Sequence, residues 1–150
     1  MIFQLMDLQQ CIASGFAELD AQQVEFAEKG NRYLRAYAAG THSAMVEPMI
    51  IYLSDYTKKH FEVQEEFMRA HGYPGTDKHV AHHCEYIREI AKVFKMMMTF
   101  KSTSDMEAFA TLSLNVGMII VDWFDFHIAQ ADTRLNEFIQ YEVRGKRRSQ

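Results

Sequence analysis

Residues 77–100, DKHVAHHCEYIREIAKVFKMMMTF, contain the clearest folding signal in the chain. Inward-type side chains recur there in alternating steps of four and three residues, a spacing that places them on one face of an α-helix. The same alternation is typical of the seam between helices in a left-handed bundle. We therefore predict a helix over this stretch, with a buried face made of His79, His83, Tyr86, Ile90, Val93 and Met97.

Three other stretches repeat this periodicity. The first runs from about residue 18 to residue 39 and stops at Gly40, a usual helix terminator. The second runs from about residue 43 to residue 72 and is followed by the turn signal Tyr73-Pro74-Gly75. The third begins at Ser104, because Ser104-Asp-Met-Glu107 matches a capping box. A shorter helical segment, from Asp132 to about Tyr141, is expected to follow.

Short connections between these stretches make neighbouring helices antiparallel. The sequence thus predicts an all-α fold, an up-down-up-down four-helix bundle with an N-terminal arm and a short C-terminal helix. The length of 150 residues fits one domain, which we assign to residues 1–150. Within it, residues 1–15 form the arm and residues 142–150 a basic tail, interpreted as solvated rather than as a membrane or RNA contact.

Composition narrows the function classes. A formal net charge of -4 gives no reason to expect a nucleic-acid partner. The two cysteines, Cys11 and Cys84, are too few for a disulfide framework, which favours a reducing cytoplasm. The longest apolar run, residues 116–121, is too short to span a bilayer, so we expect a cytoplasmic protein without a membrane contact.

Polar residues occupy the helix seams where a core normally excludes them. Two imidazoles four residues apart can bind one ion, because four residues bring a helix back to within about 40° of the same direction. Buried imidazoles need partners, and a metal ion would satisfy several together. The alternative is a polar core held by hydrogen bonds alone. The inward-pointing set is Gln23, His60, Gln64, His79, His83 and His127, with Asp132 placed near a helix end.

These positions also carry a resemblance that extends from Phe16 to about Tyr141. Its motifs are Leu19-Asp20-Ala-Gln-Gln23 with Asn31, His60-Phe61 with Glu65 and Met68, Tyr73-Pro74, His79-x-x-x-His83, and Trp123-x-x-x-His127-Ile128-x-x-x-Asp132. In this order and spacing, the chain resembles the hemerythrin family, specifically the single-domain bacterial hemerythrins. The resemblance implies a four-helix bundle that binds two non-haem irons and reversibly binds oxygen.

The resemblance also implies a ligand set. His79, His83 and His127 match the ligands of a three-histidine iron, Asp132 matches a bridging carboxylate, and His60 matches one ligand of the second iron. Two of the family's seven usual ligands are replaced, because Gln23 stands where a histidine is expected and Gln64 where the bridging glutamate is expected. Phe61 and Trp123 should wall the metal pocket, and Phe124 should narrow it.

Both replacements weaken the same side of the site. We therefore predict one tightly bound metal, iron or alternatively zinc, and a second position that is weak or empty. Alternatively, Gln23 and Gln64 hydrogen-bond to each other and fill the second position as a polar pair.

The functional expectation is a non-enzymatic carrier, store or sensor of oxygen or a related small diatomic or anionic ligand, with no catalytic residue. Two alternatives stay open. One is a mononuclear iron enzyme acting on peroxide or nitric oxide, and the other is a structural or interaction bundle whose metal site has degenerated.

Overall fold

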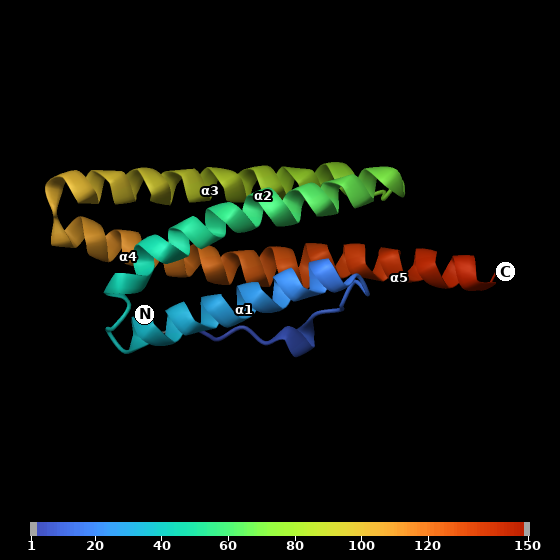
Figure 1. The fold of residues 1–150 in the computed structure, drawn as a ribbon, viewed down its shortest axis with the longest axis horizontal. Coiled ribbons are helices and arrows are strands. Elements are labelled where there is room, and N and C mark those ends of the chain that lie inside the picture. The colour runs from blue at the N-terminus through green and yellow to red at the C-terminus, as the bar shows by residue number, and fades with distance from the viewer. Residues whose placement is uncertain (1–2, 149–150) are drawn as a thin grey trace.

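The computed structural model describes residues 3–148, without the side chains at positions 10, 143, 144 and 146–148. In that part of the chain there is no strand, and four long helices form the predicted up-down-up-down bundle (Figure 1). The helix α1 packs against α2 and α4, and α3 packs against the same two helices. The helical bounds are α1 (Ala17–Ala38), α2 (Val46–Ala70), α3 (Thr76–Thr103), α4 (Met106–Asp122) and α5 (Thr133–Arg148), with short 3-10 turns at Leu8–Gln10 and Ser43–Met45.

The turn between α3 and α4 differs by one residue from the predicted capping box. Ser104 ends α3 in the left-handed backbone region, with a φ of 54°. Asp105 is the cap of α4, because its carboxylate accepts hydrogen bonds from the backbone N–H groups of Glu107 and Ala108. A carboxylate at this position satisfies backbone donors that have no partner inside the helix.

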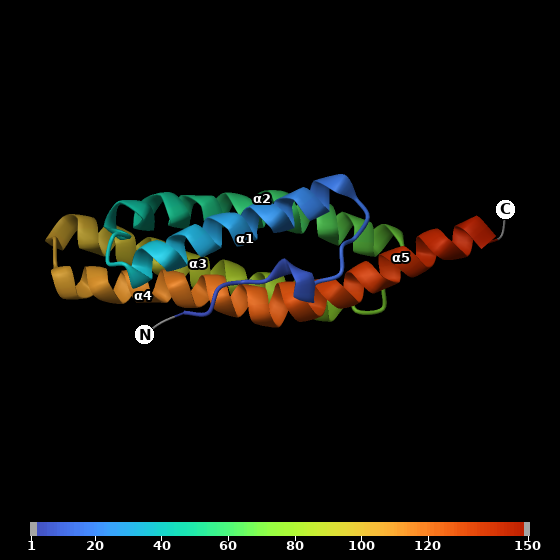
Figure 2. The same ribbon diagram turned by 90° about the horizontal axis from the view of Figure 1, so that it is seen from below.

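The predicted break before a short C-terminal helix is absent. A π-helical segment, Trp123–Asp132, joins α4 directly to α5, so the last helix runs without interruption from Met106 to Arg148. Asp132 therefore lies inside a helix rather than near a helix end. The backbone of α5 continues beyond the turn between α2 and α3 in both views (Figures 1 and 2). The side chains of Arg144, Lys146, Arg147 and Arg148, the basic residues of the predicted tail, lie outside the described residues.

This last helix is long and apolar enough to cross a membrane if only length and composition are considered. Its most apolar stretch, between Met106 and Glu142, has a mean hydropathy of 1.3, and 44% of that stretch is buried inside the protein. Val116, Ile120 and Ile128 of this helix lie in the bundle core. The core thus accounts for part of the apolar character.

The segment before α1 lies along the bundle in the second view (Figure 2). The Asn31 side chain of α1 exchanges two hydrogen bonds with the backbone of Met6, at 2.8 and 3.0 Å. At the other side, the Asn136 amide of α5 donates to the carbonyl of Ile12 at 2.6 Å. The segment is therefore attached to both the first and the last helix.

The core contains an aromatic layer in which each of the four helices contributes one ring. The rings of Phe26 and Tyr56 lie 5.0 Å apart, and those of Tyr86 and Trp123 lie 4.0 Å apart. All four side chains are buried. Tyr56 precedes His60 by four residues and Trp123 precedes His127 by four, so this layer lies about one helical turn from the histidines.

Candidate metal centre

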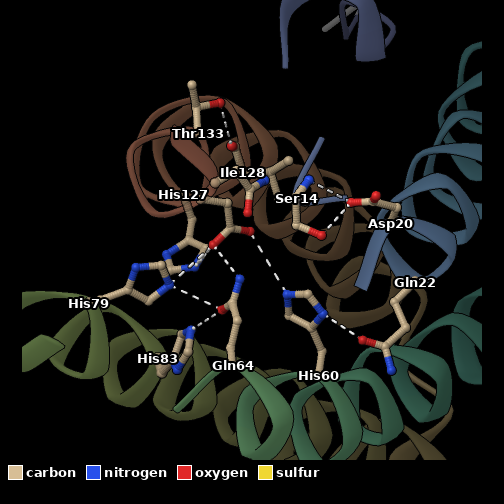
Figure 3. Close-up of polar contacts among 12 residues, drawn as sticks. Ser14, Asp20, Gln22, His60, Gln64, His79, His83, His127, Ile128 and Thr133 are labelled. Carbon is tan, nitrogen blue, oxygen red and sulfur yellow. Dashed lines mark hydrogen bonds and ion pairs between the residues drawn. The ribbon is translucent and has the colours of Figure 1, made fainter. Parts of the chain in front are cut away.

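Three histidines from two helices converge in the bundle core (Figure 3). His79 and His83 project from α3, and His127 projects from the π-helical segment. Each is at most 3% exposed, and one ring nitrogen of each lies within 4.8 Å of the other two. The prediction that these histidines point inward and meet is confirmed, and together they could hold a metal ion.

Asp132 joins this cluster because of the π-helical segment. In a regular α-helix, five residues would rotate the Asp132 side chain about 140° away from His127. Hydrogen bonds of the i→i+5 type enlarge the turn, so that residues five apart approach the same face. The Oδ1 atom of Asp132 lies 3.0 Å from Nε2 of His127 and 3.1 Å from Nε2 of His79.

Gln64 occupies the centre of the polar cluster. Its side-chain oxygen lies 3.1 Å from Nε2 of both His79 and His83, and its amide donates to Oδ1 of Asp132 at 2.9 Å. Gln23 is also buried, at 7% exposure. In the described part of the chain no hydrogen bond connects Gln23 with Gln64, so the mutual pairing considered above is not the arrangement observed.

His60 and His79 lie on opposite sides of Gln64 (Figure 3), and His60 approaches the Asp132 carboxylate through its other oxygen. Its Nε2 atom lies 3.9 Å from Oδ2 of Asp132, whereas Oδ1 faces His79 and His127. The other ring nitrogen of His60 lies 2.7 Å from the side-chain oxygen of Gln22. The single carboxylate therefore has imidazoles on both sides, and Gln22 orients the isolated one.

Glu65 also contacts this cluster, a role that the sequence analysis did not assign to it. Its position five residues after His60 directs it about 140° away from the ligand face of His60 in a regular helix. The structure instead places its carboxylate 2.9 Å from Nδ1 of His83. A carboxylate on the outer nitrogen fixes the tautomer and ring orientation of a metal-binding imidazole. The feature of the sequence that could have indicated this contact is the position of Glu65 directly after Gln64 on α2.

Aromatic rings cover the faces of three imidazoles. Phe61 stacks on His83 with ring centres 3.7 Å apart, and Trp123 stacks on His127 at the same distance. The interplanar angles are only 1° and 12°. Both residues therefore cover rings of the histidine cluster, as predicted.

The ring of Tyr56 lies over His60 at 4.8 Å, and the sequence analysis had not assigned this residue to the site. Phe124 is buried in the core, but none of the described ring contacts joins it to a histidine. Its predicted effect on the ligand pocket stays a prediction.

The electrostatics favour a bound cation. Burial and the neighbouring histidines lower the pKa of His83 to about 2. Burial lowers the pKa of His127 to about 4, although Asp132 acts in the opposite direction. Burial alone would raise the pKa of Asp132, but the surrounding imidazoles hold it well below its ordinary value. At neutral pH the cluster thus combines two neutral imidazoles with a buried negative charge.

Buried ring nitrogens without hydrogen-bond partners indicate whether the histidines and Asp132 are suited to a metal ion. Both ring nitrogens of His127 and Nε2 of His60 are buried without an aligned hydrogen bond among the described residues. Adjacent ligands on a metal about 2.1 Å away are separated by about 3 Å, and opposite ligands by about 4 Å. The distances of 3.0 and 3.1 Å from Oδ1 of Asp132 match adjacent ligands. The residues present could therefore hold a metal ion.

The chain was also compared with known proteins. No family model, curated protein or solved structure matches it. The fold and the site define a four-helix protein with a buried histidine–carboxylate cluster that could bind metal.

Proposed function

We propose that this chain is a hemerythrin-like non-haem iron protein that binds oxygen or another small diatomic or anionic ligand in the cytoplasm. The observation that carries the proposal is the environment of Asp132. One oxygen of this carboxylate faces His79 and His127, and the other faces His60. A carboxylate placed between two sets of imidazoles is suited to bridge two metal ions.

The two metal positions should differ strongly in affinity. The first would have His79, His83 and His127 with Oδ1 of Asp132, which is a full set of protein ligands for a metal with an open coordination position. The second would have His60 and Oδ2 of Asp132. The amides of Gln23 and Gln64 carry no charge, so they offset the repulsion between two cations less than carboxylates would.

Bound iron would supply the electrons and the coordination position for a small ligand. The residues around it would hold the imidazoles in place, keep the site dry and provide the negative charge. Glu65 and Gln22 would hold the outer nitrogens of His83 and His60, respectively. Phe61 and Trp123 would exclude water by covering the rings of His83 and His127.

A mononuclear iron enzyme acting on peroxide or nitric oxide is the second candidate. It is favoured by Gln64, whose amide already bonds to Asp132 and whose oxygen contacts two histidines. This amide lies where the family resemblance expects a bridging glutamate. With Gln64 in that place, a single metal and one open position would remain.

The deciding measurement is the metal content per chain after anaerobic purification, together with an absorption spectrum before and after oxygen. Two irons and a reversible visible band would establish an oxygen binder. One metal without such a band, with turnover of peroxide or nitric oxide, would favour the mononuclear enzyme. A chain that folds identically after chelation and shows no metal affinity would refute both and indicate a structural bundle.

A double variant tests the reason for the weak second position. We expect Gln23→His with Gln64→Glu to raise the metal content toward two per chain, because it adds an imidazole and a carboxylate to the second position. The matched control is Gln4→His with Gln130→Glu, which makes the same chemical changes at exposed positions. An unchanged metal content in the first variant would contradict this account of the second position.

A further inference from the structure

A second line of apolar side chains runs along the outside of α3. Each of its members directly follows a residue of the buried face, so it repeats the alternation of four and three residues that is typical of a seam between helices. Ile87 is 48% exposed, Phe94 is 43% exposed and Met98 is 54% exposed. We call this line the outer seam, and its members are Val80, Cys84, Ile87, Ala91, Phe94 and Met98.

A groove of about 1000 Å³ lies between the outer seam and α2, the helix that packs beside α3 (Figure 1). Its lining includes Ile87, Ala91 and Phe94 of the seam, together with Thr57 and Phe61 of α2. A hydrophobic groove of this kind can accept the apolar face of another helix. The surface is therefore suited to bind a helix that carries apolar side chains at the same spacing.

The charges around this groove cancel. Glu65 and Arg69 form an ion pair at 3.0 Å, and the other charged lining residues make no ion pair within the described chain. A balanced surface attracts a strongly charged partner little, whereas it can face a copy of itself without net repulsion. The cations of the lining are Lys58, Arg69 and Lys95, and the anions are Glu62, Glu65 and Glu66.

The order of side chains along the outer seam also suits a second copy. When two copies of α3 pack antiparallel, Ile87 of one copy can lie opposite Ala91 of the other. In this register every pair joins a larger side chain to a smaller one, so the layers of the interface have similar volumes. A parallel pairing would place Phe94 against Phe94 and Ala91 against Ala91, which makes the layers unequal. The remaining antiparallel pairs are Cys84 with Phe94 and Val80 with Met98.

We propose that the outer seam and its groove bind a second copy of this chain, with the two α3 helices antiparallel. Such an interface is isologous, because the same residues contribute from both copies around a two-fold axis. The axis would pass between the two pairs formed by Ile87 and Ala91. The histidine cluster lies on the buried face of α3, so this proposal does not depend on which metal, if any, it binds.

Sedimentation equilibrium of the full-length protein, in the presence of a reductant, tests this association. We expect a dimer with a dissociation constant of about 10 µM or lower. Phe94→Asp and Ala91→Arg should each weaken it about thirtyfold or more, because each places a charge in the centre of the apolar interface. Ala91 is exposed, so its replacement leaves the core of the single chain intact. The matched controls are Phe126→Asp and Ala110→Arg, at exposed positions on the last helix.

Disulfide formation with diamide tests the antiparallel register. In a Cys11→Ser chain, Phe94→Cys should give a covalent dimer, because the introduced thiol lies opposite Cys84 of the second copy. The oxidation is carried out at a concentration at which this variant sediments as a dimer. The Cys11→Ser chain without Phe94→Cys should remain uncrosslinked, because the antiparallel register separates the two Cys84 residues by about 15 Å along the helix axis.

Three outcomes would overturn the proposal. The first is a monomer mass for the unmodified chain at the highest soluble concentration. The second is equal weakening by the seam variants and their matched controls. The third is a disulfide between two Cys84 side chains, which would show a parallel pairing.

Discussion

Acid should destabilise the metal-free protein through His83 and His127. In the folded state the pKa of His83 is about 2 and the pKa of His127 is about 4, both below the ordinary value of 6.5. The unfolded chain therefore binds protons near pH 6.5, whereas the folded chain does not. Stability from the two neutral imidazoles is complete above pH 6.5 and is lost as the pH falls toward the folded-state values.

The expected size of this effect follows from the two pKa shifts. For each pH unit between the unfolded-state and the folded-state pKa, each histidine lowers the free energy of unfolding by about 1.4 kcal/mol. Near pH 5, about 1.5 units below the unfolded-state pKa, each histidine lowers the free energy of unfolding by about 2 kcal/mol. The pair together lowers it by about 4 kcal/mol. Domains of this kind have a free energy of unfolding of about 5–15 kcal/mol, so the loss is a large fraction of the total.

Urea unfolding followed by circular dichroism, in the presence of a chelator, measures this loss. The free energy of unfolding should fall by about 4 kcal/mol between about pH 8 and about pH 5, and His83→Gln should reduce the fall to about 2 kcal/mol. His71→Gln, at an exposed histidine, is the control and should leave the fall unchanged. A wild-type stability that changes by less than about 1 kcal/mol over this range would refute the reasoning.

Three further variants test individual contacts. Phe61→Ala should lower the free energy of unfolding by about 3–5 kcal/mol in urea titrations, because it empties a buried position and uncovers His83. Asn136→Ala should lower it by about 1–2 kcal/mol and speed proteolysis of the N-terminal segment, whose carbonyl loses its donor. Glu65→Gln should weaken zinc binding about 10–100-fold in chelator competition, whereas Glu66→Gln, at its exposed neighbour, should not. Equal zinc affinities for these two glutamate variants would remove Glu65 from the site.

Much of the fold follows from hydrophobic periodicity. The helices of residues 17–38, 46–70 and 76–103 differ from the expected bounds by at most three residues, because their buried faces follow ordinary helical spacing. The inward direction of His60, Gln64, His79 and His83 follows from that spacing too.

The last helix was less predictable because its geometry changes along its length. From Ile119 to Asn136, buried residues come in adjacent pairs that repeat every four positions, as in Trp123-Phe124, His127-Ile128 and Ala131-Asp132. A regular α-helix would rotate such a pattern by about 40° per repeat, and the π-helical segment takes up part of this rotation. The four-residue repeat of buried pairs was the signal in the sequence for this change of helix geometry. Capping and turn motifs mark where helices begin and end, so they did not reveal it.

Contacts between side chains of different helices could not be predicted from spacing within one helix. Gln22 meets His60 across 38 positions, and Gln64 meets Asp132 across 68. These distances depend on how the helices are rotated about their axes, a property of the packed bundle. Periodicity therefore indicated which residues are buried, and only the assembled structure shows which of them are partners.

The π-helical segment makes the centre sensitive to chain length as well as to residue type. Inserting one residue between His127 and Asp132 would leave every ligand present but would turn Asp132 and all of α5 by about 100°. The same rotation would move Asn136 and Gln140 away from Ile12 and Ala13, the carbonyls to which they donate. Insertions in this part of the helix therefore threaten the site and the attachment of the N-terminal segment together, and selection on the gene would act on the number of codons here as well as on their identity.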